Sequence, residues 1–272
     1  MKSVSTTKFW SVWSQTVRLR ERMAALGQAV LPAACLVCEH PASDKQLPAG
    51  SALCRYCKQI HDLALFSPQS ACLRCALPLT QPTVNTAACL EDLALFCPDC
   101  LQRPPPFQRC RASTYYETVP RALVSKLKVE KKLIAADFIA SVMSESVTAE
   151  SAISVDSVLP VPLHRRRYRS RGFNQSQEIA KRLAKQLSLD LLADQAERIV
   201  DTPTQQRLSR KERELNLKGA FVAHKRRLAG RRVAVIDDVV TSTATVSALA
   251  TTLRDAGVSY CEVWCYSRTP SP

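Results

Sequence analysis

Four Cys-x-x-Cys motifs between residues 35 and 100 constrain the first part of this chain more than any other feature. The motifs are Cys35/Cys38, Cys54/Cys57, Cys72/Cys75 and Cys97/Cys100. Each motif presents two thiolates to one metal ion, and two motifs complete a closed, tetrahedral four-sulfur site of the structural zinc type. Paired in sequence order, the four motifs therefore predict two structural zinc sites and no catalytic zinc.

Disulfide formation and thiol-redox chemistry are two alternatives to zinc binding for these motifs on the sequence alone. Disulfide frameworks belong to secreted proteins, and charges at Arg18, Arg20, Glu21 and Arg22 interrupt the segment where a signal peptide needs an apolar core. A redox motif accounts for one Cys-x-x-Cys but not for four. The sequence contains no run of about 18 apolar residues, so no membrane span is expected. We expect a cytoplasmic protein with reduced, metal-binding thiols, and buried or incidental thiols at Cys89, Cys110, Cys261 and Cys265.

Three segments are expected from the change in pattern along the chain. Residues 1–30 form an N-terminal helical segment, and residues 31–110 form the cysteine-rich double zinc-binding module. Pro104, Pro105 and Pro106 give this module an extended end that is typical of a linker. Residues 111–272 form a separate domain.

Alternating strand and helix patterns predict an α/β fold with a parallel sheet for residues 111–272. The last unit is the clearest, because an apolar strand, an amphipathic helix with Val246, Leu249 and Leu253 on one stripe, and a second apolar strand follow one another. This order implies parallel pairing through a right-handed crossover. Asn174 is expected to cap a helix, with Gln177 completing a capping box. The expected strands are 112–116, 154–163, 231–236 and 258–267, the expected helices are 121–142, 174–187 and 245–257, and a basic loop is expected at 163–173.

Residues 233–246 carry the most chemical information in the chain. The strand delivers Asp237 and Asp238 to its carboxyl end, where ligands gather in open α/β sheets. The two carboxylates suit ribose hydroxyls and Mg²⁺, which prefer oxygen ligands. Helix-opening amides and hydroxyl side chains after them suit a phosphate, and the residues concerned are Thr241, Ser242, Thr243, Ala244 and Thr245. An ordinary helix cap and turn is the alternative.

This segment resembles the loop of type I phosphoribosyltransferases that binds phosphoribosyl pyrophosphate (PRPP). That loop has two acidic residues, Val, any residue, Thr-Thr-Gly, any residue and Thr, and the matching residues are Asp237, Asp238, Val239, Thr241 and Thr245. Ser242 replaces a Thr. Thr243 stands where the loop normally has Gly, which permits close backbone approach or a positive φ.

Two further segments resemble the ComF family. Residues 160–175 carry Pro-Val-Pro-Leu-His followed by Arg-Gly-Phe-Asn-Gln, and a later signature matches at Arg198, Thr202, Gln205, Leu208, Arg213, Asn216 and Phe221. The resemblance implies a phosphoribosyltransferase-like fold in bacterial proteins linked to DNA uptake in competence. It also implies PRPP with Mg²⁺ as the ligand, Asp237 and Asp238 as catalytic residues, and Arg171, Gly172 and Asn174 on the pyrophosphate side.

Two classes of function follow from this pattern. The first is an enzyme that transfers phosphoribosyl to an unknown acceptor. The second is a non-catalytic module that binds single-stranded DNA through zinc ribbons and basic runs, with a PRPP-sensing or decayed pocket. Residues 161–185 and 207–232 hold eight and ten Lys or Arg residues in a chain of net charge +14, which favours an anionic partner. Aromatic residues make up 6% of the chain, so stacking platforms for DNA bases are few.

Overall fold

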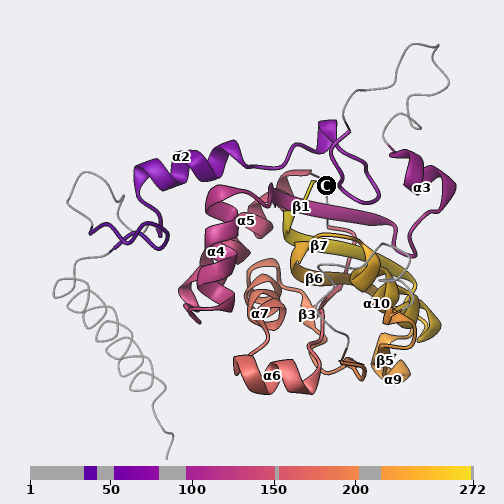
Figure 1. Ribbon diagram of the computed structural model, residues 1–272. Coiled ribbons are helices and arrows are strands. Elements are labelled where there is room, and N and C mark those ends of the chain that lie inside the picture. Colours follow the sequence, from indigo (N-terminus) through magenta and orange to yellow (C-terminus); the bar gives the residue numbers. More distant parts are fainter. Residues whose placement is uncertain (1–33, 42–51, 80–95, 151–152, 202–215, 271–272) are drawn as a thin grey trace, which may run out of the picture. The chain divides into compact units, whose positions relative to one another are not determined.

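The computed structural model describes residues 34–41, 52–79, 96–150, 153–201 and 216–270 (Figure 1). The chain divides into two compact units, one up to Lys58 and one from Gln59 onward. The helical segment expected at residues 1–30 lies outside the described residues. Within the described ranges, no helix is both long and apolar enough to cross a membrane.

A five-stranded parallel sheet forms the centre of the second unit, which confirms the predicted α/β class. Its order is β1-β7-β6-β2-β3. The strands are β1 (Arg109–Tyr115), β7 (Tyr260–Arg268), β6 (Arg232–Val240), β2 (Ser157–Pro160) and β3 (Asp190–Leu191). The strands β6 and β7 pair in parallel with Asp237 opposite Cys265, as the crossover predicts. Their apolar runs are buried because helices cover both faces of the sheet.

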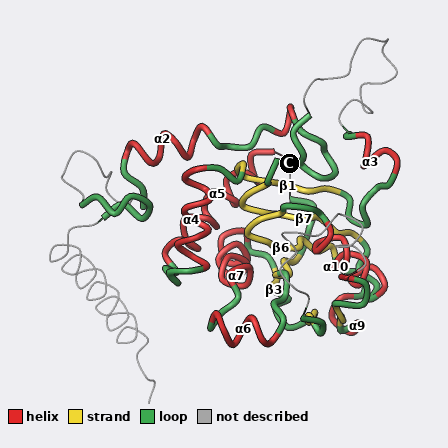
Figure 2. The backbone as a smooth tube through the Cα atoms, in the orientation of Figure 1, coloured by secondary structure: helices red, strands yellow, loops and turns green. Residues whose placement is uncertain are grey.

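Helices on opposite faces of the sheet enclose its core (Figures 1 and 2). The helices α5 (Ile134–Glu150) and α7 (Gln175–Leu187) pack together on one face, and α4 (Thr118–Lys128) packs against α5. The helix α10 (Ala244–Asp255) covers the other face with Val246, Leu249 and Leu253 buried, as predicted. A two-stranded antiparallel sheet of β4 (Ala196–Arg198) and β5 (Phe221–Ala223) precedes α9 (Lys225–Leu228), and β5 packs against α10.

The single helix expected at 121–142 was a wrong prediction, because the structure has two helices there. The first, α4, ends at Lys128 and α5 begins at Ile134. Between them Lys131 has a φ of 57°, in the left-handed region that interrupts a right-handed helix. A non-glycine residue in this conformation leaves no signal in the sequence.

The basic loop expected at 163–173 is also a correction, since it contains the helix α6 (Arg165–Arg171). His164 caps its start by accepting a hydrogen bond from the Arg166 amide, and Gly172 ends it at a φ of 87°. Arginine is a good helix former. The helix buries none of its residues, so the apolar periodicity that reveals most helices is missing here.

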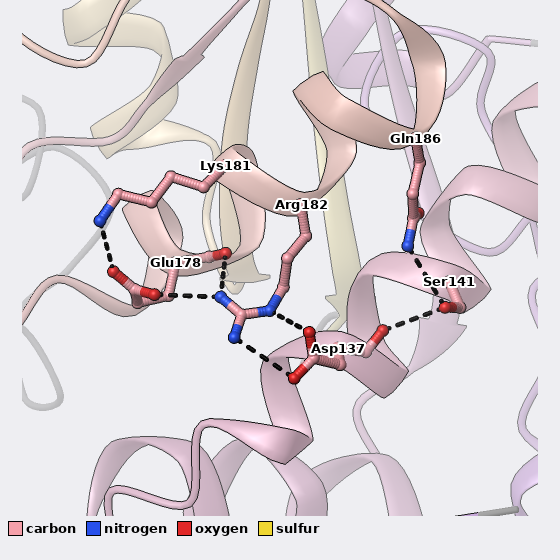
Figure 3. Close-up of polar contacts among 6 residues, drawn as sticks. All are labelled: Asp137, Ser141, Glu178, Lys181, Arg182 and Gln186. Carbon is pink, nitrogen blue, oxygen red and sulfur yellow. Dashed lines mark hydrogen bonds and ion pairs between the residues drawn. The ribbon is translucent and has the colours of Figure 1, made fainter. Parts of the chain in front are cut away.

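The helices α5 and α7 are joined by polar contacts across their surface (Figure 3). Arg182 donates to Asp137 at 2.5 Å and to Glu178 at 3.0 Å, and so links the two helices. Lys181 adds a second cation to Glu178 at 2.8 Å. These contacts hold α7 against α5, and the first turn of α7 contributes to the site described below.

The cysteine-rich part contributes three short helices to the described residues. They are α2 (Arg55–Leu63), η1 (Pro68–Ser70) and α3 (Pro98–Gln102). Cysteines flank or begin these helices, with Cys54 and Cys57 around the start of α2 and Cys97 capping α3.

Candidate functional site

The four Cys-x-x-Cys motifs form two clusters of four cysteines, the first motif with the second and the third with the fourth, as predicted. They are Cys35, Cys38, Cys54 and Cys57, and Cys72, Cys75, Cys97 and Cys100. Within each cluster all Sγ atoms lie within 4.8 Å of one another. A tetrahedral zinc ion with bonds of about 2.3 Å requires sulfurs about 3.8 Å apart. Cys38 and Cys54 are 3.8 Å apart and Cys75 and Cys97 are 3.6 Å apart, so both clusters fit one tetrahedral metal ion.

The surroundings of the thiols point to the same occupant. Burial and the neighbouring thiols together raise the pKa of Cys57, since several sulfur atoms close together cannot all ionise without compensation. A divalent cation would supply that compensation and hold the sulfurs as thiolates.

A short repeat underlies one half of each cluster. Residues 34–41 and 71–78 both read Ala-Cys-Leu-x-Cys-x-x-Pro. In both, the Ala and the Pro form an isolated antiparallel bridge, and the amide of the first cysteine donates to the residue before the proline, at 3.0 and 2.8 Å. Glu39 and Ala76 occupy the same turn position with φ of 59° and 56°. The repeat therefore builds the same cysteine knuckle twice, and it is a sequence signal that motif counting missed.

The remaining cysteines agree with the expectation of buried thiols where they are described. Cys110, Cys261 and Cys265 are buried in β1 and β7. Burial and the charge of Glu262 raise the pKa of Cys261 to about 12, which keeps this thiol protonated. Cys89 lies outside the described residues.

The two carboxylates of the predicted ligand site lie on β6, which runs through them rather than ending at residue 236 as expected. Asp238 is buried, with 2% of its surface exposed, and its carboxylate forms an ion pair with Lys128 at the end of α4. Gln175 donates to the other oxygen of Asp238 at 3.2 Å. Asp237 is half-buried and accepts from the Ser176 hydroxyl at 3.0 Å.

Burial and mutual repulsion set the charge state of this pair. Desolvation, followed by the neighbouring charge of Asp238, raises the pKa of Asp237 to about 7. Burial of Lys128 lowers the pKa of its ammonium, but the neighbouring carboxylate of Asp238 has the larger effect. The pKa of Lys128 is therefore raised. Lys128 is thus the cation that pairs directly with these two acidic groups.

Residues of the predicted pyrophosphate side meet the carboxylates at the junction of α6 and α7. Arg171 donates to the Gln175 side chain, so a hydrogen-bonded series runs from Arg171 through Gln175 to Asp238. Gly172 is exposed, and the Lys131 ammonium lies 3.8 Å from where a Cβ of Gly172 would stand. The connection between α4 and α5 therefore places a further cation, Lys131, beside the loop.

Asn174 is fixed by the backbone on both sides of its amide. Its oxygen accepts from the Ser176 amide at 3.0 Å and caps α7 as predicted, while its nitrogen donates to the Val161 carbonyl at 3.0 Å. Asn174 thus ties the first turn of α7 to the end of β2.

The predicted phosphate turn joins β6 to α10. Thr241 is exposed and Ser242, Thr243 and Thr245 are partly exposed, whereas Ala244 is buried as the first residue of the helix. Thr243 caps α10 with a φ of −73°. This conformation is open to any residue, so the glycine of the related loops is not required for backbone conformation here.

Sequence reasoning missed three residues of this site. Gln175 and Ser176 follow directly on the Arg-Gly-Phe-Asn segment, so their place at the start of α7 was a usable signal. Lys128 lies in a segment that was predicted as a helix, and no motif around it indicated a function. Of the later signature, Thr202, Gln205, Leu208 and Arg213 lie outside the described residues.

Comparisons with known proteins place the chain in a family, although no family model matches it. DNA utilization protein YhgH of Salmonella typhimurium is 31% identical over 243 residues, which are 88% of this chain and 98% of that protein. The Escherichia coli K12 YhgH matches at 31% over 244 residues with the same shares. Competence protein F of Haemophilus influenzae is 28% identical over 66% of this chain and 81% of its own.

Among solved structures, the glutamine PRPP amidotransferase of B. subtilis, complexed with ADP and GMP, covers 48% of this chain and 26% of its own. Its sequence identity is 19% and the TM-score is 0.33. The sequence relatives carry the assignment, because the YhgH proteins match along nearly their whole length. The chain therefore belongs to the family of DNA utilization protein YhgH and competence protein F, the ComF family that its motifs resemble.

Proposed function

We propose that this protein binds PRPP with Mg²⁺ at the carboxyl end of β6. The observation that carries the proposal is the meeting of two groups at one strand end. Asp237 and Asp238 lie near the end of β6, and the turn that follows leads into α10, whose first amides together with the hydroxyls of Thr241 and Ser242 suit a phosphate. An acidic pair next to an anion site fits a ligand that carries both hydroxyls and phosphate.

The parts of PRPP are assigned by charge. The 5'-phosphate belongs over residues 241–245, and the ribose hydroxyls belong with Asp237 and Asp238. The pyrophosphate belongs beside Arg171 and Gly172, where Lys131 adds positive charge. Asn174 takes a positioning role, because backbone groups already occupy its amide.

Magnesium fits this set of residues. The carboxylates and hydroxyls are the hard oxygen ligands that it prefers, and it is usually held by one or two carboxylates together with substrate phosphates. When bound it would neutralise pyrophosphate charge. Lys128 now fills the cation position at Asp238, so ligand binding requires this ion pair to rearrange.

The activity that this arrangement supports is transfer of phosphoribosyl to an acceptor that the site does not identify. Pyrophosphate leaves the anomeric carbon with the electron pair of the broken bond, and the ribose ring gains oxocarbenium character. Asp237 and Asp238 stabilise positive charge on the ring, and Arg171 stabilises the departing pyrophosphate. The acceptor's lone pair then forms the new bond to the anomeric carbon.

We further propose that zinc fills both cysteine clusters and that the protein resides in the cytoplasm, where thiols stay reduced. Four thiolates in tetrahedral spacing are the donor set that zinc prefers in structural sites. Such sites supply folding free energy to a region with little core of its own.

A thermal shift assay tests the PRPP proposal. PRPP with Mg²⁺ should raise the melting temperature, because a ligand that binds the folded state stabilises it by mass action. The double variant Asp237→Asn/Asp238→Asn should lose the shift and keep its circular dichroism spectrum. Asp190→Asn, at an exposed carboxylate on β3, is the matched control and should keep the shift. An equal shift in the double variant would reject the carboxylates as ligands, and pyrophosphate release with a mixture of bases tests turnover.

Single-stranded DNA is a second candidate ligand, favoured by the helix α6. Arg165, Arg166 and Arg169 are exposed on it together with Tyr168, which gives cations beside one stacking platform. The names of the relatives, DNA utilization and competence, agree with this proposal. Binding should weaken with salt, with a log-log slope of about 0.7 per phosphate contact. Fluorescence anisotropy should show a smaller slope after Arg165, Arg166 and Arg167 are changed to Ala, and an unchanged slope removes α6 from this role.

A further inference from the structure

Arg268, the last residue of β7, is a buried cation at the back of the phosphate turn. Its exposed fraction is 2%. Its Nη1 donates toward the carbonyl oxygens of Val240 at 2.9 Å, Thr241 at 2.5 Å and Thr269 at 2.8 Å. A guanidinium withdrawn from water is costly unless its donors are satisfied, and here backbone carbonyls accept from its Nε and Nη1.

The same guanidinium also reaches the second cysteine cluster. Its Nε donates at 2.9 Å to the carbonyl of Cys75, one of the four clustered thiol residues. Ala76, the left-handed turn residue of that knuckle, is fully buried in the same apolar cluster as Val240 and Ala244. The knuckle and the phosphate turn are therefore joined by a hydrogen-bonded cation and by packing.

These hydrogen bonds fix the direction of the turn amides. In a trans peptide the carbonyl and the following N–H point in opposite directions. Drawing the carbonyls of Val240 and Thr241 toward Arg268 directs the amides of Thr241 and Ser242 away from it. An anion over the turn requires this orientation, and the cation behind the turn adds favourable charge.

We infer that Arg268 is a positioning residue that makes the phosphate turn depend on the metal of the second cysteine cluster. Metal at the second cluster holds the Cys75 carbonyl in place, Arg268 is held by that carbonyl, and the turn is held by Arg268. The first cluster, Cys35 to Cys57, shares the knuckle fold but belongs to the other compact unit of the chain. The ligand part of this inference rests on the proposed PRPP function, whereas the coupling of metal to turn does not.

Hydrogen exchange of residues 240–246, read by mass spectrometry in the full chain, tests the coupling without any ligand. Cys75→Ser should remove about one metal ion and speed exchange of this segment by about tenfold or more. Cys57→Ser is the matched control in the first cluster, and it should remove a metal ion while leaving the segment unchanged. Equal exchange in the wild type and Cys75→Ser, or equal acceleration in both variants, overturns the inference.

Variants at Arg268 test the path itself. Arg268→Met should speed exchange of the same segment. Adding Cys75→Ser to Arg268→Met should change the exchange rate less than twofold, because both changes interrupt the same path and their effects do not add. Arg268→Lys keeps the charge but loses the forked guanidinium, so it should speed exchange to the same extent. It replaces Arg268→Met in the test if the methionine variant fails to fold. Independent, additive effects overturn the role of Arg268.

Ligand binding then separates this inference from the proposed function. With PRPP and Mg²⁺, calorimetry should show an affinity at least about tenfold weaker in Arg268→Lys and in Cys75→Ser than in the wild type. If the wild type binds no PRPP while exchange follows the pattern above, the proposed function fails and the coupling stands. Unchanged affinity in both variants removes the positioning role.

Discussion

Changing Lys128 to methionine should leave the buried carboxylate of Asp238 without its cation. In the structure Asp238 is 2% exposed, and Lys128 and Gln175 are its side-chain partners. Methionine keeps most of the length of the lysine and removes the charge. The free energy of unfolding should fall because a buried charge without a partner is expensive.

The size of the loss follows from how deeply the pair is buried. Breaking a buried ion pair costs about 3–5 kcal/mol. The Lys128 side chain is 28% exposed, so water screens part of the interaction and the lower end, about 3 kcal/mol, applies. For a unit of this size each kcal/mol shifts the melting temperature by about 2–4 °C. We expect a fall of roughly 6–12 °C.

Chemical denaturation with a double-mutant cycle measures this. Lys128→Met/Asp238→Asn should be more stable than Lys128→Met alone, because the orphaned charge has gone, with a coupling of about 2 kcal/mol. Lys132→Met is the control, since its surface pair with Glu130 is partly exposed and should matter by less than about 1 kcal/mol. Mg²⁺ should stabilise Lys128→Met more than the wild type by filling the vacated cation position. A loss no greater than that of Lys132→Met, or a coupling near zero, would refute the reasoning.

Three further outcomes are expected. Purified protein should carry about two zinc ions by elemental analysis, and Cys35→Ser and Cys97→Ser should each lose about one; absence of metal without chelator would reject the zinc sites. The pKa of Asp237 is raised from 3.8 to about 7, so its contribution to stability is full below about pH 4 and is lost as pH rises through 7, and Asp237→Asn should remove this decline between about pH 4 and 8. Over the same range the PRPP and Mg²⁺ melting shift of the wild type should grow, as the ionised carboxylate forms. Glu262→Gln should cost about 3 kcal/mol in urea denaturation, because it removes the charge paired with buried Arg111 at 3.0 Å, and a loss under 1 kcal/mol would contradict this.

Sequence patterns predicted the parts of the fold that depend on local regularity. The final strand, helix and strand were found because β6 and β7 are buried apolar runs and α10 carries one apolar stripe. The two cysteine clusters were found because Cys-x-x-Cys spacing is the one that coordination of a single ion requires. Both signals lie within a few dozen residues.

The parts that depend on tertiary contact were not predictable in this way. The helix α6 has no buried face, and Lys131 interrupts a helix in a conformation that its residue type does not announce. Lys128 reaches the candidate site across more than 100 residues of sequence, to Asp238. Arg268 reads as an ordinary charged residue after an apolar strand, and its role depends on carbonyls from two distant segments.

The position of β7 in the sheet has a consequence for how the chain is made. The strand β7 comes last in sequence but lies between β1 and β6, and it pairs Arg109 with Glu262. At about 5–20 residues per second, synthesis of the intervening 150 or so residues takes roughly 10–30 seconds. During that interval the edge of β1 that pairs with β7 stays unpaired, and β6 adds apolar surface and a second unpaired edge near its end, which makes the nascent chain prone to aggregate. Chaperone demand during translation should therefore be highest just before β7 emerges from the ribosome.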